Sequence, residues 1–307
     1  MEKKALTTAD VPARFLQAAL LVGHIPLRAV ACDPRVSYAL YVPPHHYNPS
    51  PAQGEDKVPL LVYMHGTRRD ISAIHDAHGL VAFAETTPCA VLAPLFPAGL
   101  DGANDIDSYK LLRSKTLRSD LVLLSMLDEI AQRWPGVRTE KIFMMGFSGG
   151  GQFAHRFLYL YPERLAAVSV GAPGRVTSLD SQKKWPMGVA DAEALFGRTV
   201  QADLLRKVPI QLVIGSADTV VHGGEEFWVW HREMKARDGS GRVEAGDCEN
   251  GDLPQMDRGR LESIRGLQAM WKRHGIDSHL DIVPGVAHDD KGVRESVLQF
   301  MRPHLQA

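Results

Sequence analysis

The chain has 307 residues, 45% of them hydrophobic and 23% charged, and its 35 Lys and Arg residues nearly balance 36 Asp and Glu residues. This balance gives no support for nucleic-acid binding, which usually shows a basic patch or stripe. The three cysteines, Cys32, Cys89 and Cys248, are too sparse for a disulfide framework and lie in no metal-ligand spacing. We therefore expect a protein of a reducing compartment that binds neither nucleic acid nor metal.

The N-terminal region is apolar from Val11 to Val30, but polar residues and prolines interrupt it. The interrupting residues are Pro12, Arg14, Gln17, His24, Pro26 and Arg28. Such a stretch is neither a clean signal-peptide core nor a membrane span. We therefore expect a cytoplasmic protein that does not bind a membrane.

Apolar patterns predict strands and helices that alternate along the chain. Short apolar runs predict strands at residues 36–42, 59–64, 90–94, 141–145, 166–170, 208–214 and 278–283. Helical spacing predicts helices at residues 71–83, 121–134 and 151–160. Ser119 is the predicted N-cap of the second helix, and the strand at 36–42 alternates only partly, as an edge strand does. Because the alternation continues without a long linker, we expect one α/β domain over residues 1–307.

The strongest local signal is Gly146-Phe147-Ser148-Gly149-Gly150, which fits G-x-S-x-G between a predicted strand and a predicted helix. In this context the pattern predicts a nucleophile elbow, where a serine at a sharp turn presents its hydroxyl. The flanking glycines are needed because a side chain there would collide with the strand or the helix. Ser148 is therefore the predicted nucleophile.

A serine hydroxyl is a weak nucleophile at neutral pH, so it needs a base and a carboxylate that orients this base. Asp218 and His288 each follow a predicted strand, and they come after Ser148 in the order Ser, Asp, His. The rival residues of the same types have no predicted strand directly before them: His222, His231, Asp247 and Asp252. We therefore predict Asp218 as the acid and His288 as the base.

These motifs resemble the α/β-hydrolase fold and, within it, the group of esterases similar to polyhydroxybutyrate depolymerases. Residues 61–66, 145–151, 171–174 and 283–289 carry the resemblance. It implies a mostly parallel, doubly wound sheet with helices on both faces and a small lid region. It also implies Ser148 as nucleophile, His288 as general base, Asp218 as orienting acid, and no metal or organic cofactor.

The same resemblance implies an oxyanion hole made by two backbone N–H groups. A His-Gly pair, here His65-Gly66 after the predicted strand at 59–64, shapes the loop that donates one of them. The second donor is the residue after the nucleophile, Gly149. The expected donors are thus Gly149 and either Thr67 or Arg68.

Two stretches exceed the minimal alternation of strands and helices, at residues 175–207 and 222–261. In α/β-hydrolases, insertions at these places lie above the catalytic serine, so we expect both to cover the substrate pocket. Trp185, in the first stretch, is a candidate substrate contact. Ordinary packing helices and a surface loop explain the two stretches equally well.

Arg68 and Arg69 follow the oxyanion-loop glycine, so one of them can face the pocket. A guanidinium there binds a carboxylate through paired hydrogen bonds. Arg68 and the neighbouring His65 are therefore candidate substrate contacts, and monoesters of diacids or hydroxyacid oligomers are candidate substrates. In the alternative interpretation both arginines are solvated or pair with acids such as Asp70.

Together these residues predict the hydrolysis of a small-molecule carboxylic ester by a Ser-His-Asp triad. A serine peptidase or amidase, and a thioesterase or acyltransferase, would use the same residues. The absence of a recognisable peptide-binding domain favours the ester. A non-catalytic binding protein of the same fold ranks last, because all three triad residues are present.

Overall fold

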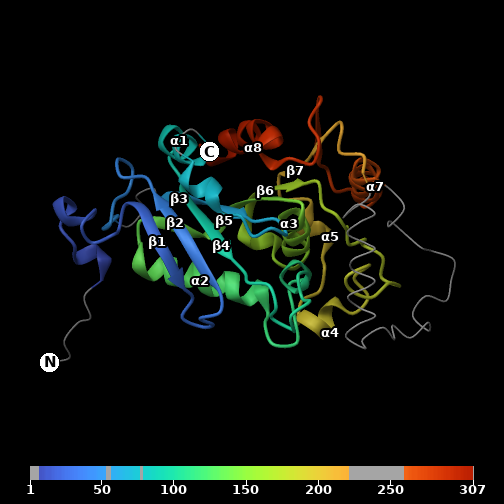
Figure 1. The fold of residues 1–307 in the computed structure, drawn as a ribbon, viewed down its shortest axis with the longest axis horizontal. Coiled ribbons are helices and arrows are strands. Elements are labelled where there is room, and N and C mark those ends of the chain that lie inside the picture. The colour runs from blue at the N-terminus through green and yellow to red at the C-terminus, as the bar shows by residue number, and fades with distance from the viewer. Residues whose placement is uncertain (1–6, 53–56, 77–78, 221–258, 307) are drawn as a thin grey trace.

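The computed structural model describes residues 7–52, 57–76, 79–220 and 259–306. These residues form one eight-stranded sheet with the order β1-β2-β4-β3-β5-β6-β7-β8 (Figure 1). The strands are β1 (Gly23–Ala29), β2 (Ser37–Val42), β3 (Val58–Met64), β4 (Ala90–Leu95), β5 (Val137–Phe147), β6 (Leu165–Gly171), β7 (Ile210–Gly215) and β8 (His279–Val283). Only the pairs β1–β2 and β2–β4 are antiparallel, and every other pair is parallel.

Helices cover both faces of the sheet (Figure 1). The α-helices are α1 (Leu80–Thr86), α2 (Ser119–Arg133), α3 (Gly149–Leu160), α4 (Ala192–Phe196), α5 (Ala202–Leu205), α7 (Arg260–Arg273) and α8 (Asp290–Leu305). The 3-10 turns are η1 (Thr8–Asp10), η2 (Ala13–Phe15), η3 (Ser72–His75), η4 (Ser108–Leu111) and η5 (Pro162–Arg164). Apolar residues of α1 and α8 share one buried cluster, and those of α2, α3 and α7 share the other.

The central strands are apolar along nearly their whole length because both of their faces are covered. In β3 every residue except Pro59 is buried, and in β7 all six are. If polar and apolar residues alternated along these strands, every second side chain would face solvent, as in an antiparallel sheet with one solvated face. The predicted mostly parallel sheet with helices on both faces is therefore confirmed.

The prediction of an edge strand at residues 36–42 was wrong. β2 occupies this stretch, and it is an inner strand because β1 pairs with it along the outer side. β1 was not predicted, since Pro26 and two polar residues, His24 and Arg28, interrupt its apolar pattern. The pairing of β1 shifts register between Ile25 and Arg28, so Pro26 lies at an irregularity of the edge strand, where a missing N–H is tolerated.

Two details of the predicted helices were also wrong. Residues 71–83 do not form one helix: the 3-10 turn η3 covers Ser72–His75, and α1 begins at Leu80. Ser119 is the first residue of α2 rather than its N-cap, which is Arg118. The Ser119 hydroxyl instead donates to the carbonyl of Tyr109 at 3.0 Å, so it fastens the preceding loop to the helix.

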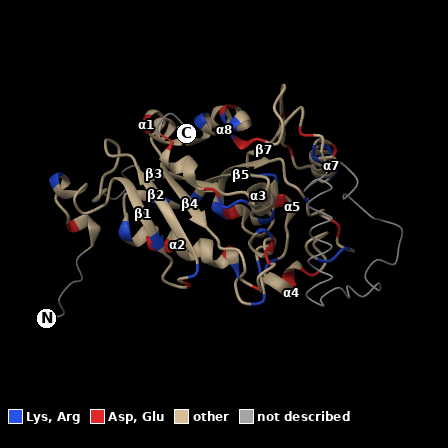
Figure 2. Ribbon diagram, viewed as in Figure 1, with Lys and Arg blue, Asp and Glu red and all other residues tan. Residues whose placement is uncertain are grey.

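Charged residues of both signs are scattered over the described helices and loops (Figure 2). No described helix combines the length and the apolar character that crossing a membrane requires. The insertion at 175–207 contains α4 and α5, whereas most of the insertion at 222–261 lies outside the described residues.

Candidate active site

Ser148 lies at the turn between β5 and α3 with φ 56° and ψ −115°, a conformation that a non-glycine residue rarely adopts. Holding it costs about 1–3 kcal/mol, which the surrounding packing must supply. The flanking glycines make this packing possible. A Cβ on Gly146 would lie 2.3 Å from the carbonyl oxygen of Gly150, and one on Gly150 would lie 2.1 Å from that of Met64. The turn thus has the geometry expected of a nucleophile elbow.

A hydrogen-bonded chain connects Ser148, His288 and Asp218. His288 Nε2 lies 3.0 Å from Ser148 Oγ, and His288 Nδ1 lies 2.6 Å from Asp218 Oδ2. Because a carboxylate can only accept, Nδ1 carries the proton and Nε2 is left to accept from the serine hydroxyl. Each residue follows the carboxyl end of a parallel strand, β5, β7 or β8, which brings together positions up to 140 residues apart.

Arg260, the first residue of α7, completes the surroundings of Asp218. Its Nη1 donates to Asp218 Oδ1 at 2.7 Å, so each carboxylate oxygen has a side-chain partner among the described residues. Burial by itself raises the pKa of Asp218, but the hydrogen bond from His288 and the charges of His288 and Arg260 outweigh it. The pKa of Asp218 is therefore held below its ordinary value, and the carboxylate stays ionised at neutral pH. Sequence reasoning missed Arg260, because no local pattern links it to a residue 42 positions earlier.

Thr67 and Gly149 lie next to each other beside the elbow. A Cβ on Gly149 would lie 2.9 Å from the Thr67 nitrogen and 2.6 Å from the Tyr109 hydroxyl oxygen. Among the described residues, the N–H groups of Thr67 and Gly149 donate to no acceptor. Two free, adjacent N–H groups beside Ser148 are the arrangement that an oxyanion hole requires.

Arg69 supports the loop that carries Thr67. Its guanidinium donates to the carbonyls of Thr67, Phe96, Pro97 and Ile106, at 2.7, 2.9, 3.3 and 3.2 Å. The same group lies over the ring of Tyr109, 5.1 Å from its centroid. Because its donors are used inside the protein, Arg69 fixes the loop and is not available to a substrate.

His65 is also committed inside the protein. It is fully buried, its Nδ1 donates to the carbonyl of Gly66 at 2.8 Å, and its Nε2 accepts from the N–H of Phe96 at 3.1 Å. Burial lowers the pKa of His65 from 6.5 to about 4, so the ring is neutral at neutral pH. Both ring nitrogens are hydrogen-bonded to backbone groups, so His65 is not a substrate contact and instead shapes the loop.

Arg68 and Trp185 have different surroundings. Arg68 is exposed and makes no hydrogen bond or ion pair with any described residue. Trp185 is half-buried, donates its indole N–H to the carbonyl of Leu111 at 2.9 Å, and packs edge-on against Phe196 at 4.9 Å. The indole N–H of Trp185 is thus already hydrogen-bonded inside the protein, so only the exposed apolar part of the ring can contact a substrate.

Thr177, in the insertion at 175–207, is clamped by three side chains of α3. His155 accepts its N–H at 3.0 Å, Arg156 donates to its Oγ1 at 2.9 Å, and Tyr159 donates to its carbonyl at 2.8 Å. The helix that starts at the elbow therefore also holds the loop after β6. Residues 221–258, with the rival residues His222, His231, Asp247 and Asp252, lie outside the described part of the chain.

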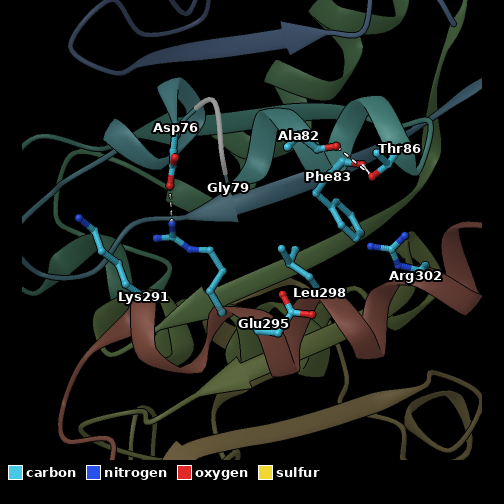
Figure 3. A pocket seen from close by; sticks show the side chains of 10 residues that line it. Asp76, Gly79, Ala82, Phe83, Thr86, Lys291, Glu295, Leu298 and Arg302 are labelled. Atoms are coloured by element: carbon cyan, nitrogen blue, oxygen red, sulfur yellow. Dashed lines mark hydrogen bonds and ion pairs between the residues drawn. The ribbon is translucent and has the colours of Figure 1, made fainter.

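A cavity of about 420 Å³ lies elsewhere, between α1 and α8 (Figure 3). Phe83 and Leu298 contribute apolar walls, and Lys291 and Arg302 contribute cationic ones. Neither the triad candidates nor the oxyanion-loop residues line this cavity. In the parts of the chain that the structure covers, no group of three or more His, Cys, Asp or Glu side chains is placed to hold a metal ion.

Comparison with known proteins relates this arrangement to solved structures. No protein-family model matches the chain, and no curated protein matches it in sequence. The structure is similar to a poly(3-hydroxybutyrate) depolymerase from Bordetella parapertussis, with 20% identity, TM-score 0.62, and coverage of 96% of this chain and 93% of that one. It is also similar to poly(aspartic acid) hydrolase-1 from Sphingomonas sp. KT-1, with 19% identity, TM-score 0.59, and coverage of 86% and 92%.

A third similar structure is an S-formylglutathione hydrolase from Agrobacterium tumefaciens, with 16% identity, TM-score 0.51, and coverage of 88% and 89% of the two chains. At these identities the likeness establishes the fold. The strand order, the elbow after β5 and these neighbours agree: the chain has the α/β-hydrolase fold.

Proposed function

We propose that the protein is a serine hydrolase that cleaves carboxylic esters of small molecules through an acyl-enzyme intermediate. The observation that carries the proposal is the unbroken chain from Ser148 Oγ to His288 at 3.0 Å and from His288 to Asp218 at 2.6 Å. A buried carboxylate, an imidazole oriented by it and a serine in a strained backbone conformation lie together here. They match the requirements of nucleophilic catalysis.

In the acylation step, Ser148 Oγ attacks the acyl carbon while His288 Nε2 takes the hydroxyl proton. The carbonyl oxygen becomes an oxyanion and accepts from the N–H groups of Thr67 and Gly149. The C–O bond to the alcohol then breaks, and His288 returns the proton to the leaving oxygen. Asp218 holds the imidazolium in position throughout and stays ionised.

In the deacylation step, water attacks the acyl-enzyme while His288 takes one of its protons. The bond between the acyl carbon and Ser148 Oγ then breaks, and the proton returns to the serine. The acid product leaves, and the free enzyme is regenerated. Every group in this cycle belongs to the chain itself, so we expect no cofactor.

The same groups can cleave a thioester or an amide, and two of the similar structures bear on this choice. One is an S-formylglutathione hydrolase and the other a poly(aspartic acid) hydrolase. An amide nitrogen is a poorer leaving group than an alkoxide, so amide cleavage requires firmer protonation by His288. We therefore rank the ester first and keep thioesters and amides as the alternatives.

The test is the hydrolysis of a panel of aryl esters, from acetate to long acyl chains, by wild type and Ser148→Ala. We expect activity in the wild type that the variant loses, together with covalent labelling of Ser148 by a fluorophosphonate. A folded wild-type protein that cleaves thioesters or amides but no ester would move the proposal to those substrates. Equal activity in both proteins would contradict the serine mechanism.

Arg68 carries the finer proposal that the substrate bears a carboxylate. Its side chain is exposed, follows the oxyanion-loop residue Thr67, and has no partner among the described residues. A guanidinium in this position can donate two parallel hydrogen bonds to a carboxylate. Arg68→Ala is expected to raise KM for acid-tailed acyl groups and to leave neutral esters unchanged. An unaltered preference between the two substrate types would exclude this role.

A further inference from the structure

The Thr67 hydroxyl is a buried polar group that the proposed mechanism has not used. Its oxygen is shielded from solvent and has no hydrogen-bond partner among the described residues. Buried hydroxyl groups in folded proteins are nearly always bonded, and an exception calls for a specific reason, such as a catalytic role. Valine has nearly the same shape as threonine, so filling this space does not by itself require a hydroxyl.

The position of the Thr67 hydroxyl indicates why it has no partner among the described residues. A Cβ built on Gly149 would lie 2.9 Å from the Thr67 nitrogen and 3.0 Å from the Thr67 hydroxyl oxygen. Both polar atoms of Thr67 therefore approach the same point beside Gly149, where the proposed oxyanion hole lies. The hydroxyl oxygen stands next to the N–H groups that are expected to bind the carbonyl oxygen of the substrate.

The polar groups around this hydroxyl are engaged elsewhere, and none of the described ones is its hydrogen-bond partner. Tyr109 donates its hydroxyl proton to the carbonyl of His65 at 3.1 Å. Arg69 donates to the carbonyl of Thr67 at 2.7 Å, which fixes the backbone of the residue that carries the hydroxyl. The Thr67 side chain is thus held on a rigid loop with a proton that no described acceptor receives.

We propose that the Thr67 hydroxyl is a third donor of the oxyanion hole, beside the N–H groups of Thr67 and Gly149. This inference rests on the proposed function. The hydroxyl finds its acceptor when the carbonyl oxygen of the substrate acquires negative charge, and the proton stays on Thr67 throughout. A hydrogen bond that strengthens as the charge develops lowers the barrier of the chemical step more than it tightens substrate binding.

The experiment compares Thr67→Val with Thr67→Ser. Valine keeps the shape, the β-branch and the backbone N–H but removes the hydroxyl, whereas serine keeps the hydroxyl. Thr67→Val is expected to lower kcat roughly 10- to 100-fold with KM little changed, below the loss for a principal oxyanion donor. Thr67→Ser is expected to recover most of this loss. Thr199→Val, at an exposed position, controls for the exchange of threonine for valine.

A second readout does not depend on ester turnover. The rate of Ser148 labelling by a fluorophosphonate, whose phosphoryl oxygen mimics the oxyanion, is expected to fall in Thr67→Val and to recover in Thr67→Ser. Thermal unfolding of each variant shows that the proteins are folded. Wild-type kcat and labelling rate in a folded Thr67→Val would overturn this inference while the proposed function stands. A wild type that neither cleaves the ester panel nor is labelled would overturn both.

Discussion

Arg260 and Asp218 form an ion pair at 2.7 Å in which both side chains are buried. Arg260 binds the carboxylate oxygen that His288 does not contact, so Asp218 is held from two sides. Gly259 lies directly before Arg260, and a Cβ there would come within 2.2 Å of the carbonyl oxygen of Thr219. The start of α7 is therefore packed against the loop that carries Asp218, the proposed catalytic acid.

We predict that Arg260→Met lowers kcat/KM by about 10- to 100-fold, because a loosened Asp218 no longer holds His288 in line with Ser148. Arg260→Lys keeps the positive charge and is expected to lose less. The measurement is steady-state kinetics on the preferred ester. If both variants matched the wild type, Arg260 would not position the triad.

The same variant is expected to change the pH dependence. Arg260 is one of the groups that hold the pKa of Asp218 below its ordinary value. Removing it raises that pKa, so the carboxylate becomes protonated at a higher pH as the solution is acidified. The acid limb of the kcat/KM profile should therefore move to higher pH in Arg260→Met. A limb that stays in place would show that Arg260 acts by packing alone.

Asp218→Asn should lower kcat by about 10⁴-fold, because an amide no longer stabilises the imidazolium and favours the wrong tautomer of His288. The matched control is Asp203→Asn, which breaks an exposed ion pair with Arg206 at helix α5. We expect wild-type kinetics for the control. A mild loss in Asp218→Asn, comparable with the control, would argue for another acid.

Gly149→Ala tests how closely the loop that carries Thr67 approaches Gly149. The added methyl group would lie 2.9 Å from the backbone nitrogen of Thr67 and 2.6 Å from the hydroxyl of Tyr109, so the loop must move away. We expect kcat to fall about 100- to 1000-fold, as it does when an oxyanion donor is lost. Full activity in Gly149→Ala would show that the loop can move away without any loss of catalysis.

Gly266→Ala is the control for this exchange. Gly266 lies in α7 with nothing within 4 Å of an added Cβ. Alanine there is expected to leave kcat unchanged and to stabilise the fold by about 0.5–1 kcal/mol, because glycine in a helix loses more backbone entropy on folding. Thermal unfolding measures the second effect.

The stability of the fold should depend on pH through the buried histidine of α3. Burial, followed by the charge of Arg156, lowers the pKa of His155 from 6.5 to about 3. In the unfolded chain this histidine takes up a proton below about pH 6.5, whereas in the folded protein it stays neutral. The free energy of unfolding should therefore fall on acidification between these values, by about 1.4 kcal/mol per pH unit from this group.

A variant isolates this contribution from that of other groups. His155→Gln can still accept the N–H of Thr177 but has no proton to bind, so its unfolding free energy should depend less steeply on pH. Urea unfolding of both proteins between pH 4.5 and 7 gives the two slopes. His155 has no such role if the slopes coincide.

Most of the central strands were predictable because their physical cause is local. A strand covered on both faces must be apolar along its length, and β3, β6 and β7 show this in their own residues. The exceptions have local causes as well. Pro26 interrupts the apolar pattern of the outer strand β1, so this strand was not predicted. The apolar residues of the stretch 71–83 have helical spacing, but the structure divides this stretch into η3 and α1.

The sequence by itself determined the alternation of strands and helices along most of the chain and the positions of Ser148, Asp218 and His288 after predicted strands, because apolar runs and the glycines of the elbow are short-range signals. The tertiary structure alone decided which side chains meet. Arg260 reaches Asp218, His65 and Arg69 turn inward, and the Thr67 hydroxyl beside Gly149 has no partner among the described residues. These outcomes depend on distances between segments far apart in the chain, which no local pattern of residues encodes.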